Sequence, residues 1–286
     1  MKKREIIEGV IKDYDFPNKG SFELDGKKVI VKGALPGQKV SCMVSKVRKD
    51  KAEARLLDVL ERSEIEDAVP PCPQFGICGG CAYQTMSYEH QLELKAGQVK
   101  KLLDGVIDSE THPYDWEGII GSPVTTAYRN KMEYSFGDEY KDGPLVLGLH
   151  KKNSMYDIVP VCNCVIVSED YNRIVSYTME FARAHGLSYH KKMQHVGLLR
   201  HLVLRQSKTN GGLLINLVTS TDGLENLDLN AYVEGLLALP LDGTIIGILH
   251  TANDSLADAV VPDKVTLLYG RDYIEEEVLG LHFQIS

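Results

Sequence analysis

Three cysteines within ten residues constrain this chain more than any other feature. They stand in "CPQFGICGGCAYQ", residues 72–84, with the spacing C-x5-C-x2-C at Cys72, Cys78 and Cys81. Thiolates are soft ligands that suit zinc or an iron–sulfur cluster, and the Gly79-Gly80 pair lets the backbone wrap closely around such a group. The spacing therefore predicts a metal centre, with buried or redox-active thiols as the alternative.

The spacing of the three cysteines leaves the type of metal and the fourth ligand to be inferred from other features. Structural zinc sites usually show two C-x2-C pairs or a Cys/His pair, and this loop has one C-x2-C, which favours a [4Fe–4S] cluster. Cys162 and Cys164 come about eighty residues later, and His90 is a nearby alternative. Cys42, within a β-prone run, is expected to be a small core residue.

The rest of the composition describes an ordinary globular chain of 286 residues, long enough for about two domains. No apolar run approaches a membrane span, and the N-terminus has no signal-peptide pattern, so we expect a cytoplasmic protein without a membrane partner. The net charge of −8 is unevenly distributed: residues 1–60 hold 14 Lys+Arg against 9 Asp+Glu, and residues 206–286 hold 3 against 12. A basic head and an acidic tail indicate separate modules.

Residues 1–64 are predicted to form an OB-like β-barrel. Short β-prone runs alternate with turn signals such as Asp25-Gly26. A hairpin in this region gathers positive charge and is our first candidate for RNA contact, with a solvated turn as the alternative: Lys46, Arg48, Lys49 and Lys51, followed by Arg55.

Residues 65–286 are predicted to form an α+β central domain with a largely antiparallel sheet. A helix is expected over 87–106, with Ser87 as N-cap and an apolar stripe of Leu92, Val99, Leu102, Leu103 and Val106 that faces the core. Further helices are expected near 169–186 and 229–240, and Asn210-Gly211 marks a turn between two strands.

The motif C-x5-C-G-G-C-x2-Q, which ends at Gln84, resembles the S-adenosylmethionine-dependent RNA 5-methyluridine methyltransferases that carry a TRAM barrel and an iron–sulfur cluster. "GKKVIVKGALPGQKV" is similar to that family's barrel, and "YRNKMEYSFG" and "GLLRHLVLR" are similar to two basic motifs of its central domain. The resemblance implies a [4Fe–4S] cluster on Cys72, Cys78, Cys81 and Cys164. It favours Cys164 over Cys162, because the family's last cysteine stands shortly before an Asn-x-Ile motif, here Asn172 to Ile174.

The basic motifs add a second set of candidate RNA contacts, with salt bridges to the acidic tail as the alternative: Arg129, Lys131, Arg200, His201 and Arg205. Alternation along a strand places Arg129 and Lys131 on one face, and His201 and Arg205 on the face opposite Arg200. The expected partner is RNA, ribosomal rather than transfer.

In the family, a C-terminal Rossmann-like domain binds S-adenosylmethionine, and a thiolate there attacks the target uracil. "LYGRDYIEEEVLGLHFQIS" is similar to the stretch that precedes this domain, and the chain shows neither a cofactor loop nor a cysteine after Cys164. We therefore expect the Rossmann-like domain to be absent, no catalytic or S-adenosylmethionine-binding residues, and a partner surface on helix 87–106, which in the family belongs to the catalytic domain. The alternatives are a stand-alone iron–sulfur RNA-binding or regulatory module and a zinc-stabilised adaptor.

Overall fold

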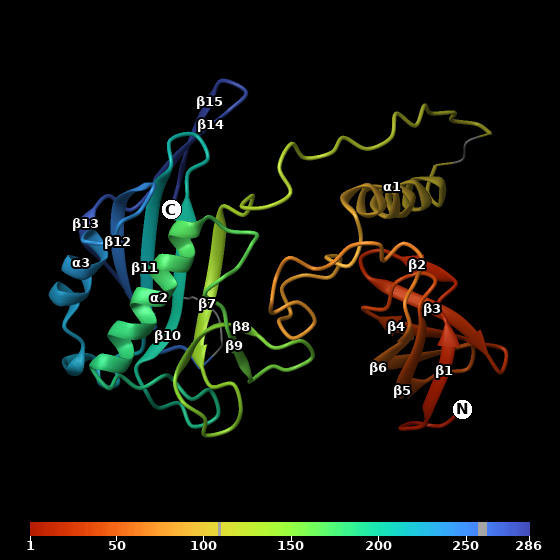
Figure 1. Cartoon of the computed structure of the whole chain (residues 1–286), viewed down its shortest axis with the longest axis horizontal. Coiled ribbons are helices and arrows are strands. Elements are labelled where there is room, and N and C mark those ends of the chain that lie inside the picture. Colours follow the sequence, from red (N-terminus) through yellow and green to blue (C-terminus); the bar gives the residue numbers. More distant parts are fainter. Residues whose placement is uncertain (108–109, 257–261) are drawn as a thin grey trace. The chain divides into compact units, whose positions relative to one another are not determined.

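The structure is a computed structural model, and it describes residues 1–107, 110–256 and 262–286. The chain forms two compact units (Figure 1). The first comprises residues 1–70 and 82–123, and the second comprises residues 71–81 and 124–286. The cysteine loop thus folds with the second unit, whereas the helix that follows it folds with the first. The boundary predicted near residue 65 stays a prediction.

The first unit contains a six-stranded sheet with the order β1-β5-β6-β4-β3-β2. Its strands are β1 (Ile6–Val10), β2 (Asp13–Asp15), β3 (Lys19–Leu24), β4 (Lys27–Lys32), β5 (Lys39–Val47) and β6 (Lys51–Glu61). The sheet is open, with β1 and β2 at its two edges, so the predicted barrel was wrong. Turn signals fix which neighbouring strands pair, but closure depends on a pairing between the two edge strands that no local signal reports.

Local predictions in this unit are confirmed. Asp25 and Gly26 both have positive φ, 52° and 68°, as a tight hairpin between β3 and β4 requires. Cys42 is completely buried among valines and alanines of the sheet, such as Val29, Val44 and Ala52. Burial of these side chains supplies the driving force for this unit.

Helix α1 (Tyr88–Asp104) begins at the predicted cap: the Ser87 hydroxyl accepts the backbone N–H of His90 at 3.4 Å. Lys101 anchors the helix to the sheet through an ion pair with Asp15. The prediction that its apolar stripe is core was wrong for Val99, Leu102 and Val106, which are exposed. Helical periodicity shows that a face is apolar, but not that another element covers it.

The second unit is built on a seven-stranded sheet with the order β13-β12-β11-β10-β7-β8-β9. Its strands are β7 (Lys131–Gly137), β8 (Val146–His150), β9 (Ile158–Pro160), β10 (Leu199–Gln206), β11 (Gly212–Thr219), β12 (Thr244–Ala252) and β13 (Lys264–Gly270). Neighbours are antiparallel except for β11 and β12, which pair in parallel. The short helix η1 (Leu224–Asn226) and α3 (Leu229–Leu237) connect these two strands. These two strands and α3 form a βαβ unit within an otherwise antiparallel sheet.

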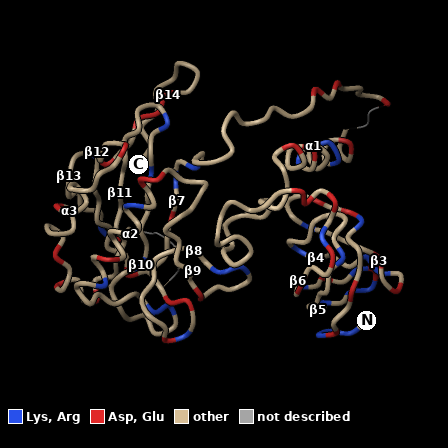
Figure 2. The backbone as a smooth tube through the Cα atoms, in the orientation of Figure 1, with Lys and Arg blue, Asp and Glu red and all other residues tan. Residues whose placement is uncertain are grey.

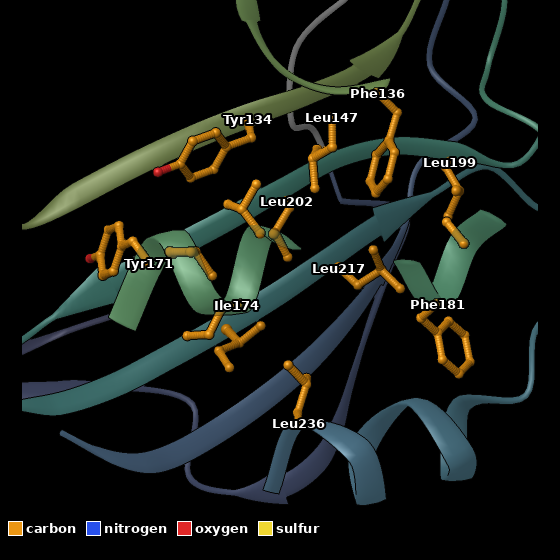
Figure 3. Packing of buried hydrophobic residues seen from close by; sticks show 14 of the residues in the cluster. Tyr134, Phe136, Leu147, Tyr171, Ile174, Phe181, Leu199, Leu202, Leu217 and Leu236 are labelled. Atoms are coloured by element: carbon orange, nitrogen blue, oxygen red, sulfur yellow. The ribbon is translucent and has the colours of Figure 1, made fainter. Parts of the chain in front are cut away.

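Helices α2 (Glu169–Ala184) and α3 cover one face of this sheet. Figure 3 shows the core between these helices and the sheet. Ile174 and Phe181 of α2 and Leu236 of α3 pack there against strand residues such as Tyr134 and Leu202. A two-stranded ribbon of β14 (Ile274–Val278) and β15 (Leu281–Ile285) follows the sheet. Among the described residues, no helix is long and apolar enough to cross a membrane.

Candidate functional site

The cysteine loop is a series of tight turns held against the β8–β9 connection. Cys78 donates its backbone N–H to the Gln74 carbonyl at 2.9 Å, and Gly76 has a φ of 87°. The Gly79 N–H bonds the His150 carbonyl at 2.9 Å, and the Lys152 N–H bonds the Ile77 carbonyl at 2.7 Å. A Cβ on Gly79 would lie 3.1 Å from the His150 oxygen, so glycine permits this close approach.

Cys164 approaches from the turn before α2. Its backbone N–H donates to the Asn172 Oδ1 at 3.0 Å, and the Asn172 Nδ2 donates to Glu169 at 3.0 Å. Cys164 is buried, whereas Cys162 is exposed. The turn therefore directs Cys164 inward and leaves Cys162 in solvent.

Four of the six thiols influence one another's ionisation. Burial raises the pKa of the Cys78 thiol, the Gly80 N–H lowers it, and Cys164 and Cys72 raise it further. Burial likewise raises the pKa of Cys164, where the backbone N–H of Ile166 lowers it and Cys81 and Cys72 raise it. Cys72, Cys78, Cys81 and Cys164, hereafter the four-thiol site, are therefore close enough for their charges to interact.

Backbone amides also point at this site. The Gly80 N–H donates to the Cys78 Sγ at 3.4 Å, and the amides of Ile166 and Val167 bond the Cys164 sulfur. Amide donors to sulfur are typical of thiolates that carry negative charge at a metal. Among the residues that the structure describes, no three His, Cys, Asp or Glu side chains converge tightly enough to hold a single metal ion.

Two tyrosines that the sequence interpretation missed lie beside the four-thiol site. Burial raises the pKa of Tyr128, and Cys81 and Cys164 raise it further. Tyr134 is fully buried, its pKa is raised by burial and by Cys164, and its hydroxyl has no hydrogen-bond partner within the described part of the chain. Alternation along β7 could have placed Tyr134 on the buried face, but not next to a cysteine thirty residues away.

The predicted basic hairpin is displayed in solvent. Lys46, Arg48 and Lys49 are exposed and Lys51 is half-buried. The Arg48 N–H bonds the Lys51 carbonyl at 2.8 Å and closes the turn, and the Lys27 Nζ donates to the Arg48 carbonyl at 3.0 Å. Lys27 therefore adds a cation that the sequence interpretation missed. Figure 2 shows how Lys and Arg are spread over this six-stranded sheet.

The second set of predicted cations divides into two groups. Lys131 and Arg205 are register partners on β7 and β10, both half-buried, and Arg129 is exposed. Lys131 pairs with Glu133 at 3.1 Å. Lys131 and Arg205 lie on the sheet face opposite α2 and α3, because they alternate along their strands with the core residues Met132 and Leu204. Arg129 precedes β7.

Arg200 and His201 are buried instead. The Arg200 Nη1 donates to the carbonyls of Asn253 at 2.7 Å and Ser255 at 2.8 Å, which fixes the segment after β12. The His201 Nδ1 lies 3.3 Å from the Ser135 hydroxyl. Their role as RNA contacts stays a prediction.

The chain is similar over its whole length to proteins named RNA methyltransferase. It is 46% identical to an uncharacterized RNA methyltransferase of Clostridium acetobutylicum, of which it covers 61%. It is 43% identical to one of Caldanaerobacter subterraneus, of which it covers 62%. The chain thus spans about three fifths of the length of these relatives. No family model matches the sequence.

The fold is similar to that of a solved methyltransferase. The tRNA (uracil-54, C5)-methyltransferase of Pyrococcus abyssi, in complex with S-adenosyl-L-homocysteine, matches 97% of this chain with a TM-score of 0.66 and 22% identity, over 59% of its own length. This likeness corrects the predicted fold class, which was wrong to exclude the methyltransferase fold. The lack of a Gly-rich cofactor loop does not exclude this fold, because a fold depends on the order and pairing of strands.

Proposed function

We propose that this chain is the RNA-binding, cluster-bearing region of an S-adenosylmethionine-dependent RNA methyltransferase that makes 5-methyluridine. The observation that carries the proposal is that the whole chain is 46% identical to part of a relative named RNA methyltransferase. The fold shared with a tRNA uracil-C5 methyltransferase supports the choice of uracil as the target base. We propose methyl transfer for a protein of the length of these relatives, of which this chain spans about three fifths.

Within that protein, the four-thiol site would hold a [4Fe–4S] cluster. Four thiols interact electrostatically, and amides of Gly80, Ile166 and Val167 donate to two of them. In such a cluster each iron takes one thiolate, so the sulfurs stand farther apart than around a single ion. When bound, the cluster supplies charge and cross-linking, and it ties the loop at 72–81 to the start of α2.

RNA would contact cations of each unit that are exposed or half-buried. In the first unit these are Lys46, Arg48 and Lys49 with Lys27, and in the second they are Arg129, Lys131 and Arg205. Arginine and lysine bind phosphates by charge and release counterions from the RNA, which supplies affinity without reading sequence.

Comparing RNA from a strain that lacks this gene with RNA from its parent tests the proposal. We expect one 5-methyluridine to disappear from a single position, in either ribosomal or transfer RNA, and to return when the intact gene is supplied. Mass spectrometry of nuclease fragments would locate it. Identical 5-methyluridine content in the two strains, with the loss of a different modification, would show that the target base is not uracil.

A further inference from the structure

A cavity of about 440 Å³ in the second unit lies outside both the four-thiol site and the basic hairpin. Three loops form it: the β7–β8 connection, the β8–β9 connection and the segment that precedes β10. Its lining includes Asp138, Tyr156, Tyr189, Lys191, Lys192 and Met193. Its volume falls within the range of small-molecule sites, roughly 300–1,000 Å³, and so suits one nucleotide.

The pocket has one side held by side-chain contacts of Tyr189 and another side, at Tyr156 and Met193, that is open to solvent. The Tyr189 hydroxyl donates to the Asp138 carboxylate at 2.8 Å, and the Lys191 Nζ lies 5.9 Å from the Tyr189 ring centre. Tyr156 is 58% exposed and Met193 is 75% exposed, and the Tyr156 hydroxyl meets the Met193 sulfur at 3.9 Å. A large exposed tyrosine at the mouth of a pocket offers a flat apolar surface on which a base can stack.

The polar groups of the pocket complement a nucleotide. Lys141, Lys191 and Lys192 supply cations for a phosphate, and Lys191 lies 3.6 Å from the Asp142 carboxylate. Asp138 and Asp157 supply acceptors for the N–H groups on the edge of a base. Donors for the phosphate and acceptors for the base therefore occur together.

The cysteine loop at residues 72–81 holds the loop that carries Tyr156. The cysteine loop bonds this loop on both sides of Lys151, through Gly79 to the His150 carbonyl and through Ile77 to the Lys152 amide, and Cys78 forms a β-bridge with Lys151. A loop that is held before its ligand arrives loses less conformational entropy on binding.

We propose that this pocket binds an unpaired nucleotide of the RNA, with the base stacked on Tyr156 and a phosphate near Lys191 and Lys192. Single-stranded RNA is recognised in this way, by stacking on aromatic side chains and contact with base edges. The inference rests on the proposed function only in taking RNA as the ligand, because the pocket itself is built from the loops described above.

Fluorescence anisotropy of the full chain with a labelled single-stranded uridine pentamer tests the proposal. Tyr156→Ala should weaken binding about tenfold, the usual scale of a lost base–aromatic stack, whereas Tyr156→Phe should retain the affinity. Tyr140→Ala is the matched control, because Tyr140 is 62% exposed on the adjacent β7–β8 loop but does not line the pocket. A pentamer with 4-thiouridine at its centre should cross-link to the peptide that contains Tyr156.

Equal affinities of the wild type and Tyr156→Ala for the pentamer would overturn the proposal that the pocket binds a nucleotide. An equal loss of affinity in Tyr140→Ala would overturn it as well. Structured RNA separates this failure from a failure of the proposed function. If Tyr156→Ala and the wild type bind both RNAs equally, only the pocket is wrong. If the wild type binds neither RNA, both proposals are wrong.

Discussion

Asn172 on α2 holds Cys164 in place: its side-chain oxygen accepts the Cys164 backbone N–H at 3.0 Å. Asn172 is itself buried and is oriented by a bond from its Nδ2 to Glu169. The Asn-x-Ile motif that the sequence interpretation used to choose between two cysteines therefore has a structural reason, since it fixes the turn that directs Cys164 inward.

Removing that acceptor should destabilise the second unit. Asn172→Ala leaves the buried Cys164 N–H without its partner, and such a loss costs about 1–3 kcal/mol of unfolding free energy. Urea denaturation measures it. Asn226→Ala is the control, because Asn226 is exposed and its side chain bonds Gly223 and Glu225 of its own turn. Equal stabilities of the two variants would mean that Asn172 does not support the cysteine turn.

Charge reversal of the basic hairpin should weaken RNA binding and flatten its salt dependence. In Lys46→Glu/Arg48→Glu/Lys49→Glu, the cations that release counterions are lost, so the slope of log affinity against log salt should fall by about two to three. Filter binding over a salt series measures this slope. The control reverses three exposed lysines of the same unit, Lys12, Lys19 and Lys32. If both triple variants lose the same affinity, overall charge and not the hairpin determines binding.

Two arginines on one strand should behave differently. Arg200 is 4% exposed and bonds two carbonyls, so Arg200→Ala should cost about 2 kcal/mol of stability through lost charged hydrogen bonds. Arg205→Ala should instead lower RNA affinity severalfold and leave the urea midpoint nearly unchanged. Urea denaturation and anisotropy on each variant compare the two. A stable Arg200→Ala with weakened RNA binding would reverse the assignment.

Burial of Cys42 predicts a dependence of stability on pH. Burial raises the pKa of the Cys42 thiol from 9.0 to about 11, so the folded thiol stays protonated where the unfolded thiol ionises. The contribution is fully present below pH 9 and is lost as the pH rises through 11, a total of about 2–3 kcal/mol. Urea denaturation between pH 8 and pH 11 in a reductant should show a shallower decline in Cys42→Ala than in the wild type. Parallel declines would contradict the account.

Local signals in the sequence predicted local structure well. The Asp25-Gly26 hairpin and the Ser87 cap depend on the φ preference or the hydrogen-bonding capacity of one or two residues, and both were confirmed. Features that depend on distant parts of the chain were not predicted. The open sheet follows from how β1 and β2 end the strand order, and the βαβ unit follows from the parallel pairing of β11 with β12.

In the candidate site, too, local features could be predicted from the sequence and long-range features could not. Alternation placed His201 and Arg205 on one strand face, but it could not show that His201 is buried and Arg205 only half-buried. The pocket around Tyr156 was missed entirely, because its three loops are separated by up to fifty residues and none carries a motif.

The four-thiol site is the central claim of this account, and iron content with absorption of anaerobically purified variants tests it most directly. The wild type and Cys162→Ser should be brown, with a broad band near roughly 400 nm and about four irons per chain, as expected for a thiolate-bound [4Fe–4S] cluster. Cys164→Ser and Cys78→Ser should lose both iron and colour. A colourless wild type with one equivalent of zinc, or iron lost in Cys162→Ser and retained in Cys164→Ser, would contradict the account.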